Sequence, residues 1–178
     1  MEQARVFVDP IDTKMQCRVV AEVERCLGIA AQSFGQTFAM IPVTFDLKGR
    51  AAGMYRVRGS ERVIRFNPWL FAKYPEDSWH NTVPHEVAHY VADCIYGLGR
   101  IKPHGPQWQH IMQLLGAEST VRANYDLEGI PVRQIKRYHY RCQCREVQLT
   151  TYRHKKIQQG QQRYRCRDCG SDLQFVLP

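Results

Sequence analysis

The stretch Pro84-His85-Glu86-Val87-Ala88-His89 decides how this chain is interpreted. Its two histidines are four residues apart, and on a helix of 3.6 residues per turn they lie on one face, one turn apart. Both imidazoles can therefore reach one metal ion. The apolar residues of the same helix occupy the opposite arc, so the metal-facing and core-facing sides separate. The alternative interpretation is an ordinary polar helix face.

Glu86 follows the first histidine and lies about 100° round the helix from it. A catalytic zinc ion needs three protein ligands and one open position, where a water molecule becomes acidic enough to act as a nucleophile. A carboxylate beside that position can take the proton and pass it to a leaving amine. The pattern therefore predicts a zinc-dependent hydrolase of amide bonds, with Glu86 as its general base.

The third ligand must come from outside the helix, and His104 is the best-placed candidate. Gly97 and Gly99 are expected to end the helix, and Gly105-Pro106 is typical of the start of the next one. A loop reversal between them would bring His104 back to the helical pair. The alternative is an exposed loop histidine.

Two positions near the motif leave alternatives open. Pro84 lacks a backbone donor, so it predicts either a kink or a late helix start near Thr82. Asp93, one turn beyond His89, either orients a ligand or is a solvated helix residue.

The flanking segments predict an α+β fold, because helical periodicity alternates with short β-type runs. We expect helices at residues 12–34, 75–96 and 105–115. We expect the strands of a small antiparallel sheet at residues 43–45, 52–57 and 62–66.

Four of the seven cysteines form two closely spaced pairs near the end of the chain. They are Cys142, Cys144, Cys166 and Cys169. Two such pairs are typical of a zinc ribbon, in which four thiolates hold a structural zinc ion. We expect the intervening residues to form strands around a polar turn at Gln159-Gly160. If only one cysteine of the first pair binds, His154 is the natural fourth ligand.

The charge is unevenly distributed and predicts two domains, 1–132 and 133–178. The first contains 14 basic and 14 acidic residues, whereas the second contains 11 basic and 3 acidic residues and so carries the whole net charge of +8. Basic residues alternate there with tyrosines, which combines phosphate neutralisation with surfaces for base stacking. We therefore expect DNA, single-stranded or irregular, as the partner of this tail. A solvated basic face is the alternative.

The composition is that of a soluble globular protein, with 44% hydrophobic and 24% charged residues. No apolar run approaches the ~20 residues of a membrane span, so no membrane association is expected. The first residues show no secretory signal, and a cytoplasmic location is expected. In a reducing compartment, seven cysteines favour metal binding over disulfides.

Over nearly its full length the chain resembles the SprT family, relatives of the Spartan proteases that degrade proteins crosslinked to DNA. The segments that carry the resemblance are 47–53, 64–68, 82–89, 104–108 and, in the cysteine-containing region, 140–144, 153–155 and 164–170. The resemblance implies a zincin-like α+β metalloprotease domain and a link to DNA. It also implies that His85, His89 and His104 are zinc ligands and that Glu86 is catalytic.

Two hypotheses follow. In the first, the protein is a DNA-associated metalloprotease with one catalytic and one structural zinc ion, and the strand at 62–66 aligns an extended protein substrate by edge pairing. In the second, it is a zinc-stabilised nucleic-acid-binding or regulatory protein whose histidine cleft has no catalytic role.

Overall fold

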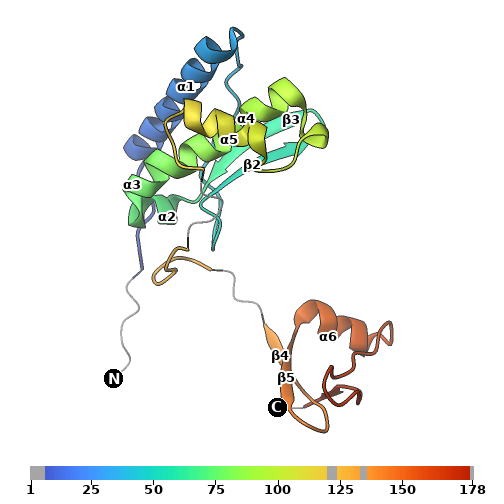
Figure 1. Ribbon diagram of the computed structural model, residues 1–178. Coiled ribbons are helices and arrows are strands. Elements are labelled where there is room, and N and C mark those ends of the chain that lie inside the picture. Colours follow the sequence, from blue (N-terminus) through green and yellow to red (C-terminus); the bar gives the residue numbers. More distant parts are fainter. Residues whose placement is uncertain (1–6, 120–123, 133–135, 177–178) are drawn as a thin grey trace. The chain divides into compact units, whose positions relative to one another are not determined.

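The computed structural model describes residues 7–119, 124–132 and 136–176. The chain divides into two compact units, Met1–Val132 and Arg133–Pro178 (Figure 1). Within the described residues, none of the helices has the length and apolarity that a bilayer crossing requires.

Helix α1, Thr13–Phe34, confirms the first predicted helix. The carboxylate of Asp12 accepts a hydrogen bond from the backbone N–H of Met15 at 2.7 Å, which caps the first turn. Gly35 ends the helix with a left-handed φ of 64°, a conformation that glycine adopts without steric cost. The stripe of residues that α1 buries in the core is Val19, Val23, Cys26, Leu27 and Ala30.

The sheet of the first unit is mixed, so the prediction of an entirely antiparallel sheet is wrong. Its strands are β1 (Val43–Thr44), β2 (Gly53–Arg58) and β3 (Glu61–Phe66), in the order β1-β3-β2. Strand β3 pairs antiparallel with β2 and parallel with β1. Because β3 has a partner on each side, it cannot align a peptide at a sheet edge as expected for residues 62–66. Strand β2 is an edge strand.

The segment predicted as one helix from 75 to 96 has three parts. A short turn α3 (Pro75–Asp77) leads into a π-helical turn (Ser78–Thr82) and then into α4 (Val83–Tyr96). In the π-helical turn the N–H of Val83 donates to the carbonyl of Ser78, five residues earlier. Pro84 has no N–H and cannot donate a hydrogen bond within a regular helix. The structure therefore shows a late start of α4, at Val83, and an irregular turn just before it.

Helix α4 is the centre of the first unit, where it contacts α1, α5 and β2 (Figure 1). A single 3₁₀ turn, Leu98–Arg100, follows it. Helix α5, Pro106–Leu114, then confirms the last helix predicted for this unit, and Gly116 with φ 73° follows its end. The apolar face of α5 packs Trp108, Ile111 and Met112 into the same core as α1.

Helix α2, Pro68–Lys73, is an element that the sequence analysis did not predict. Its N-cap is the buried Asn67, whose Oδ1 accepts from the N–H groups of Trp69 and Leu70. The amide of Asn67 also donates to the carbonyl oxygens of Gly49 and Ala51, at 3.0 and 3.2 Å. One side chain thus fixes both the start of α2 and the loop that leads into β2.

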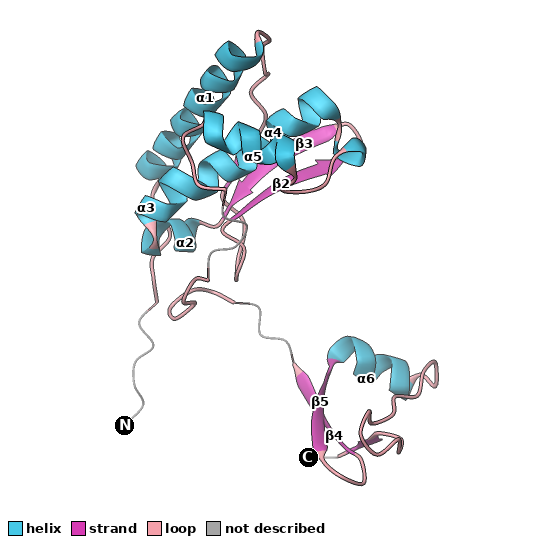
Figure 2. Cartoon of the chain, in the orientation of Figure 1, coloured by secondary structure: helices cyan, strands magenta, loops and turns pink. Residues whose placement is uncertain are grey.

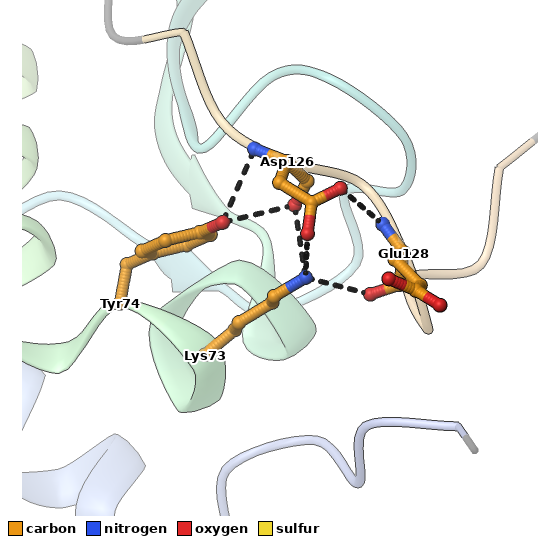
Figure 3. Close-up of polar contacts among 4 residues, drawn as sticks. All are labelled: Lys73, Tyr74, Asp126 and Glu128. Atoms are coloured by element: carbon orange, nitrogen blue, oxygen red, sulfur yellow. Dashed lines mark hydrogen bonds and ion pairs between the residues drawn. The ribbon is translucent and has the colours of Figure 1, made fainter.

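Residues 124–132 pack against α2 through a cluster of polar contacts (Figure 3). The ammonium group of Lys73 donates to the carboxylate of Asp126 at 2.8 Å and to the carbonyl of Glu128 at 2.8 Å. The hydroxyl of Tyr74 donates to the carbonyl of Asp126 and accepts from its N–H. Beneath these contacts Ile130 is buried against α2, so this segment is part of the fold.

The second unit combines a three-stranded sheet with one helix (Figure 2). Its elements are β4 (Arg137–Arg141), β5 (Glu146–Thr150), α6 (Thr151–Gln158) and β6 (Gln174–Phe175). The expected hairpin around Gln159-Gly160 is wrong, because helix α6 occupies the residues before that turn. The hairpin joins β4 to β5 and turns at the first cysteine pair, and α6 follows directly.

Candidate metal centres

The three predicted histidines converge on one point in the first unit. The Nε2 atoms of His85, His89 and His104 lie 3.1–3.2 Å from one another. Tetrahedral coordination with zinc–nitrogen bonds of about 2.0–2.1 Å places ligand nitrogens about 3.3 Å apart. The set therefore fits a single zinc-sized ion and leaves a fourth position for a non-protein ligand.

Local structure explains the convergence. His85 and His89 lie one turn apart on α4, whereas His104 precedes α5 with a left-handed φ of 56°. It is the one non-glycine residue with positive φ among the described residues. This backbone conformation is costly for a residue with a Cβ, and it occurs at functional sites whose surroundings enforce it.

Trp108 supports all three imidazoles. It is fully buried on α5, and its ring centroid lies 4.7 Å from those of His85 and His104 and 5.6 Å from that of His89. Its indole N–H donates to the backbone carbonyl of His85 at 3.3 Å. The indole thus fixes where the rings lie.

Burial keeps the imidazoles uncharged, as metal ligands must be. It lowers the pKa of His85 to about 4 and that of His89 to about 3, and the neighbouring imidazoles add to both shifts. Burial also lowers the pKa of His104.

Glu86 lines the same cavity of about 350 Å³ as the three histidines. Its Oε2 accepts a hydrogen bond of 2.6 Å from the backbone N–H of Tyr55 on strand β2. Burial raises the pKa of its carboxyl to about 8, against the opposing effect of that hydrogen bond. Gly53 touches the carboxylate from the same strand, since a Cβ there would lie 2.6 Å from Oε1. The edge strand β2 therefore sets where the carboxylate lies.

Asp93 neither orients a histidine nor faces solvent, so both interpretations considered for it are wrong. It is buried, and its Oδ2 accepts from the hydroxyl of Tyr55 and from Nε of Arg62, each at 2.7 Å. The end of α4 is thereby tied to β2 and β3. Tyr55 contacts Asp93 with its side chain and Glu86 with its backbone.

In the second unit the structure brings the four predicted cysteines together, with all four Sγ atoms within 4.8 Å of one another. Sγ of Cys144 lies 3.4 Å from that of Cys142 and 3.7 Å from that of Cys166. Zinc–sulfur bonds of about 2.3 Å in a tetrahedron give separations of about 3.8 Å. The cluster fits a closed four-sulfur metal site.

His154 does not join the cysteines. Its ring stacks on Tyr138 with centroids 3.7 Å apart, and its Nδ1 lies 2.9 Å from the hydroxyl of the buried Tyr140. Both cysteines of the first pair belong to the metal group, so the alternative with His154 as fourth ligand is wrong. The histidine belongs to a small aromatic cluster with Phe175.

Comparison with known proteins connects this geometry to one family. The family model described as SprT-like matches residues 23–139 of the chain. The chain belongs to the SprT-like family. It is 35% identical over 164 residues to Protein SprT of Vibrio atlanticus, and the aligned region covers 92% of this chain and 95% of that protein. It is 38% identical over 157 residues to Protein SprT of Pseudomonas syringae pv. tomato, and the aligned region covers 87% of this chain and 92% of that protein.

The site of this SprT-like protein includes three residues to which the sequence analysis gave no role: Gly53, Tyr55 and Trp108. Trp108 carried a usable signal, because it lies four residues after His104, in the first turn of the helix that follows. Gly53 and Tyr55 carried none, because their contacts with Glu86 join residues more than 30 positions apart.

We expect this SprT-like chain to bind two zinc ions when it is prepared with zinc in excess. His89→Ala should remove one ion and Cys166→Ser the other, because each change deletes one ligand of a separate cluster. Metal content per chain, measured by mass spectrometry of the native protein, checks this. The control is His110→Ala, which alters a histidine outside both clusters. Loss of zinc from the His110→Ala variant would contradict the assignment. Retention of both ions by His89→Ala would also contradict it.

Proposed function

We propose that this protein is a zinc-dependent endopeptidase that acts on DNA-associated or DNA-crosslinked proteins. In this proposal the first unit is a zincin-like protease domain and the second is a zinc ribbon that binds DNA. The observation that carries the proposal is the convergence of three neutral imidazoles in one cavity with a buried carboxylate.

A zinc ion held by His85, His89 and His104 would supply Lewis acidity for water and for the peptide carbonyl. Glu86 takes the proton that the attacking water loses and delivers it to the nitrogen of the leaving amine. The N–H of Tyr55 holds Oε2 of this carboxylate at 2.6 Å, and Gly53 provides the space for it. These two contacts keep the base in one orientation through both proton transfers.

The edge strand β2 is the surface along which an extended peptide aligns. Gly53, Met54 and Tyr55 of this strand line the cavity together with the histidines. An unpaired strand edge offers backbone donors and acceptors to another chain. A substrate paired there extends past the carboxylate, which suits cleavage of a polypeptide backbone.

DNA binding is proposed for the second unit, on the surface of α6. Tyr152 is 67% exposed, and the ammonium group of Lys156 lies 4.8 Å from its ring centroid. Arg153 lies in the same way over the ring of Tyr164, 5.6 Å from its centroid. Aromatic rings beside cationic groups support a surface for stacked bases and phosphates. Tyr140 is fully buried beside His154, so it is left out of the proposed surface.

Glu86→Gln is the test of the proposed protease. We expect the variant to retain both zinc ions and to lose at least ~100-fold in cleavage rate, because the amide cannot take up a proton. Cleavage of a protein bound to single-stranded DNA, followed by gel electrophoresis and mass spectrometry, measures this. Equal cleavage rates for the variant and the wild type would show that Glu86 is not the base. Metal and DNA binding with no cleavage by the wild type would favour the non-proteolytic alternative.

Gly53→Ala tests whether β2 positions the base. The added Cβ would lie 2.6 Å from Oε1 of Glu86, so the carboxylate must move while the three histidines remain. A displacement of about 1 Å can cost on the order of 100-fold in rate, and we expect a loss of roughly 10-fold to 100-fold with unchanged zinc content. The matched control is Gly28→Ala on α1, where an added Cβ meets no atom within 4 Å. Similar rates for the two variants would refute the positioning role.

The double variant Arg153→Gln, Lys156→Gln tests the proposed DNA surface. We expect weaker binding of single-stranded DNA and a smaller salt dependence, because the slope falls by about 0.7 for each phosphate that the protein no longer neutralises. Fluorescence anisotropy at several salt concentrations measures both quantities. Arg141→Gln is the control, since its guanidinium group already pairs with Glu146 at 2.6 Å. If the control weakened binding as much as the double variant, the surface would be wrongly assigned.

A further inference from the structure

Part of the lining of the histidine cavity, here called the apolar side, consists of aliphatic side chains. They are Ala92, Leu98 and Ile101. Leu98 is 43% exposed, which places it among the few large apolar side chains that the described residues leave open to solvent. Aliphatic side chains that line a cavity offer apolar surface to a bound group.

This apolar side lies close to the proposed reaction centre. Ala92 is three residues after His89 on α4, a rise of about 4.5 Å along the helix. Ile101 is three residues before His104. Because an extended peptide advances about 3.3 Å per residue, the apolar side is within about one or two residues of the imidazoles.

The size and charge of the lining limit what can enter. The small side chain of Ala92 is itself buried, so the α4 side of the cavity is formed without a bulky group. Lys102 is the only lysine or arginine among the lining residues. No carboxylate other than Glu86 is present among them to pair with a basic substrate side chain.

We propose that Ala92, Leu98 and Ile101 form a subsite for a bulky aliphatic side chain next to the scissile peptide bond. This inference rests on the proposed protease function and specifies its substrate. Burial of an aliphatic side chain against these residues removes apolar surface from water. A glycine has no side chain to bury there, and a charged side chain would lose its hydration.

A peptide library tests the preference. We expect zinc-replete, full-length protein to cut peptides with leucine, isoleucine or methionine beside the scissile bond at least ~10-fold faster than those with glycine or aspartate. Mass spectrometry of the products identifies the cleavage positions and relative rates.

Two variants and a matched control locate the subsite. Ala92→Leu fills it and should shift the preference towards glycine and alanine. Leu98→Ser removes part of its wall and should reduce the preference several-fold. Met40→Ser is the control, because Met40 is 42% exposed, much as Leu98 is, but lies outside the cavity lining. A thermal melt and the zinc content of each variant show whether it is folded.

A second measurement does not depend on cleavage. In zinc-replete Glu86→Gln protein, N-acetyl-leucinamide should shift the methyl NMR signals of Leu98 and Ile101 at millimolar concentrations, and N-acetyl-aspartamide should not. Equal shifts, or shifts only elsewhere, would overturn the subsite.

The outcomes separate the two proposals. Metal-dependent cleavage without an aliphatic preference would overturn the subsite and leave the protease function intact. Absence of any metal-dependent cleavage would contradict the protease function, whereas the methyl titration would still decide whether an aliphatic group binds at this place.

Discussion

The first unit depends on one geometric constraint, the meeting of three ring nitrogens within 3.2 Å. Two of the rings lie on α4, and the third comes from the loop that joins α4 to α5. The indole of Trp108 packs against all three and donates to the backbone of α4. The packing of α5 against α4 is therefore part of the site, and a core residue determines the ligand geometry.

The same helix also presents the carboxylate, but the sheet decides where that group lies. Tyr55 connects Asp93 near the end of α4 with Glu86 near its beginning. The loop before β2 is fixed in turn by Asn67, whose side chain bonds to both Gly49 and Ala51. Polar contacts thus fix the chain on both sides of Gly53, at Ala51 through Asn67 and at Tyr55 through Glu86.

Local signals in the sequence predicted α1, α5 and the convergence of His104 on the helical pair. Each depends on residues close in the chain, such as the apolar periodicity of residues 12–34 or the helix start at Gly105-Pro106. The expectation of an entirely antiparallel sheet was wrong, because β1 pairs parallel with β3, 21 residues further along the chain, and its short sequence does not encode its partner. Helix α2 was missed, because Asn67-Pro68 signals both the end of a strand and the start of a helix. In the second unit α6 is polar and has no apolar stripe, so its sequence gave no periodic signal for a helix. The metal cluster was predicted from the spacing of the cysteines, which does not depend on that helix.

The left-handed backbone at His104 has a further consequence for how the protein would handle its metal. A residue with a Cβ held in this conformation stores on the order of 1–3 kcal/mol of strain. The loop is held in this conformation by the start of α5 and by the indole of Trp108, 4.7 Å from the His104 ring. The third ligand would thus depend on tertiary packing, whereas the other two need only the helix that carries them.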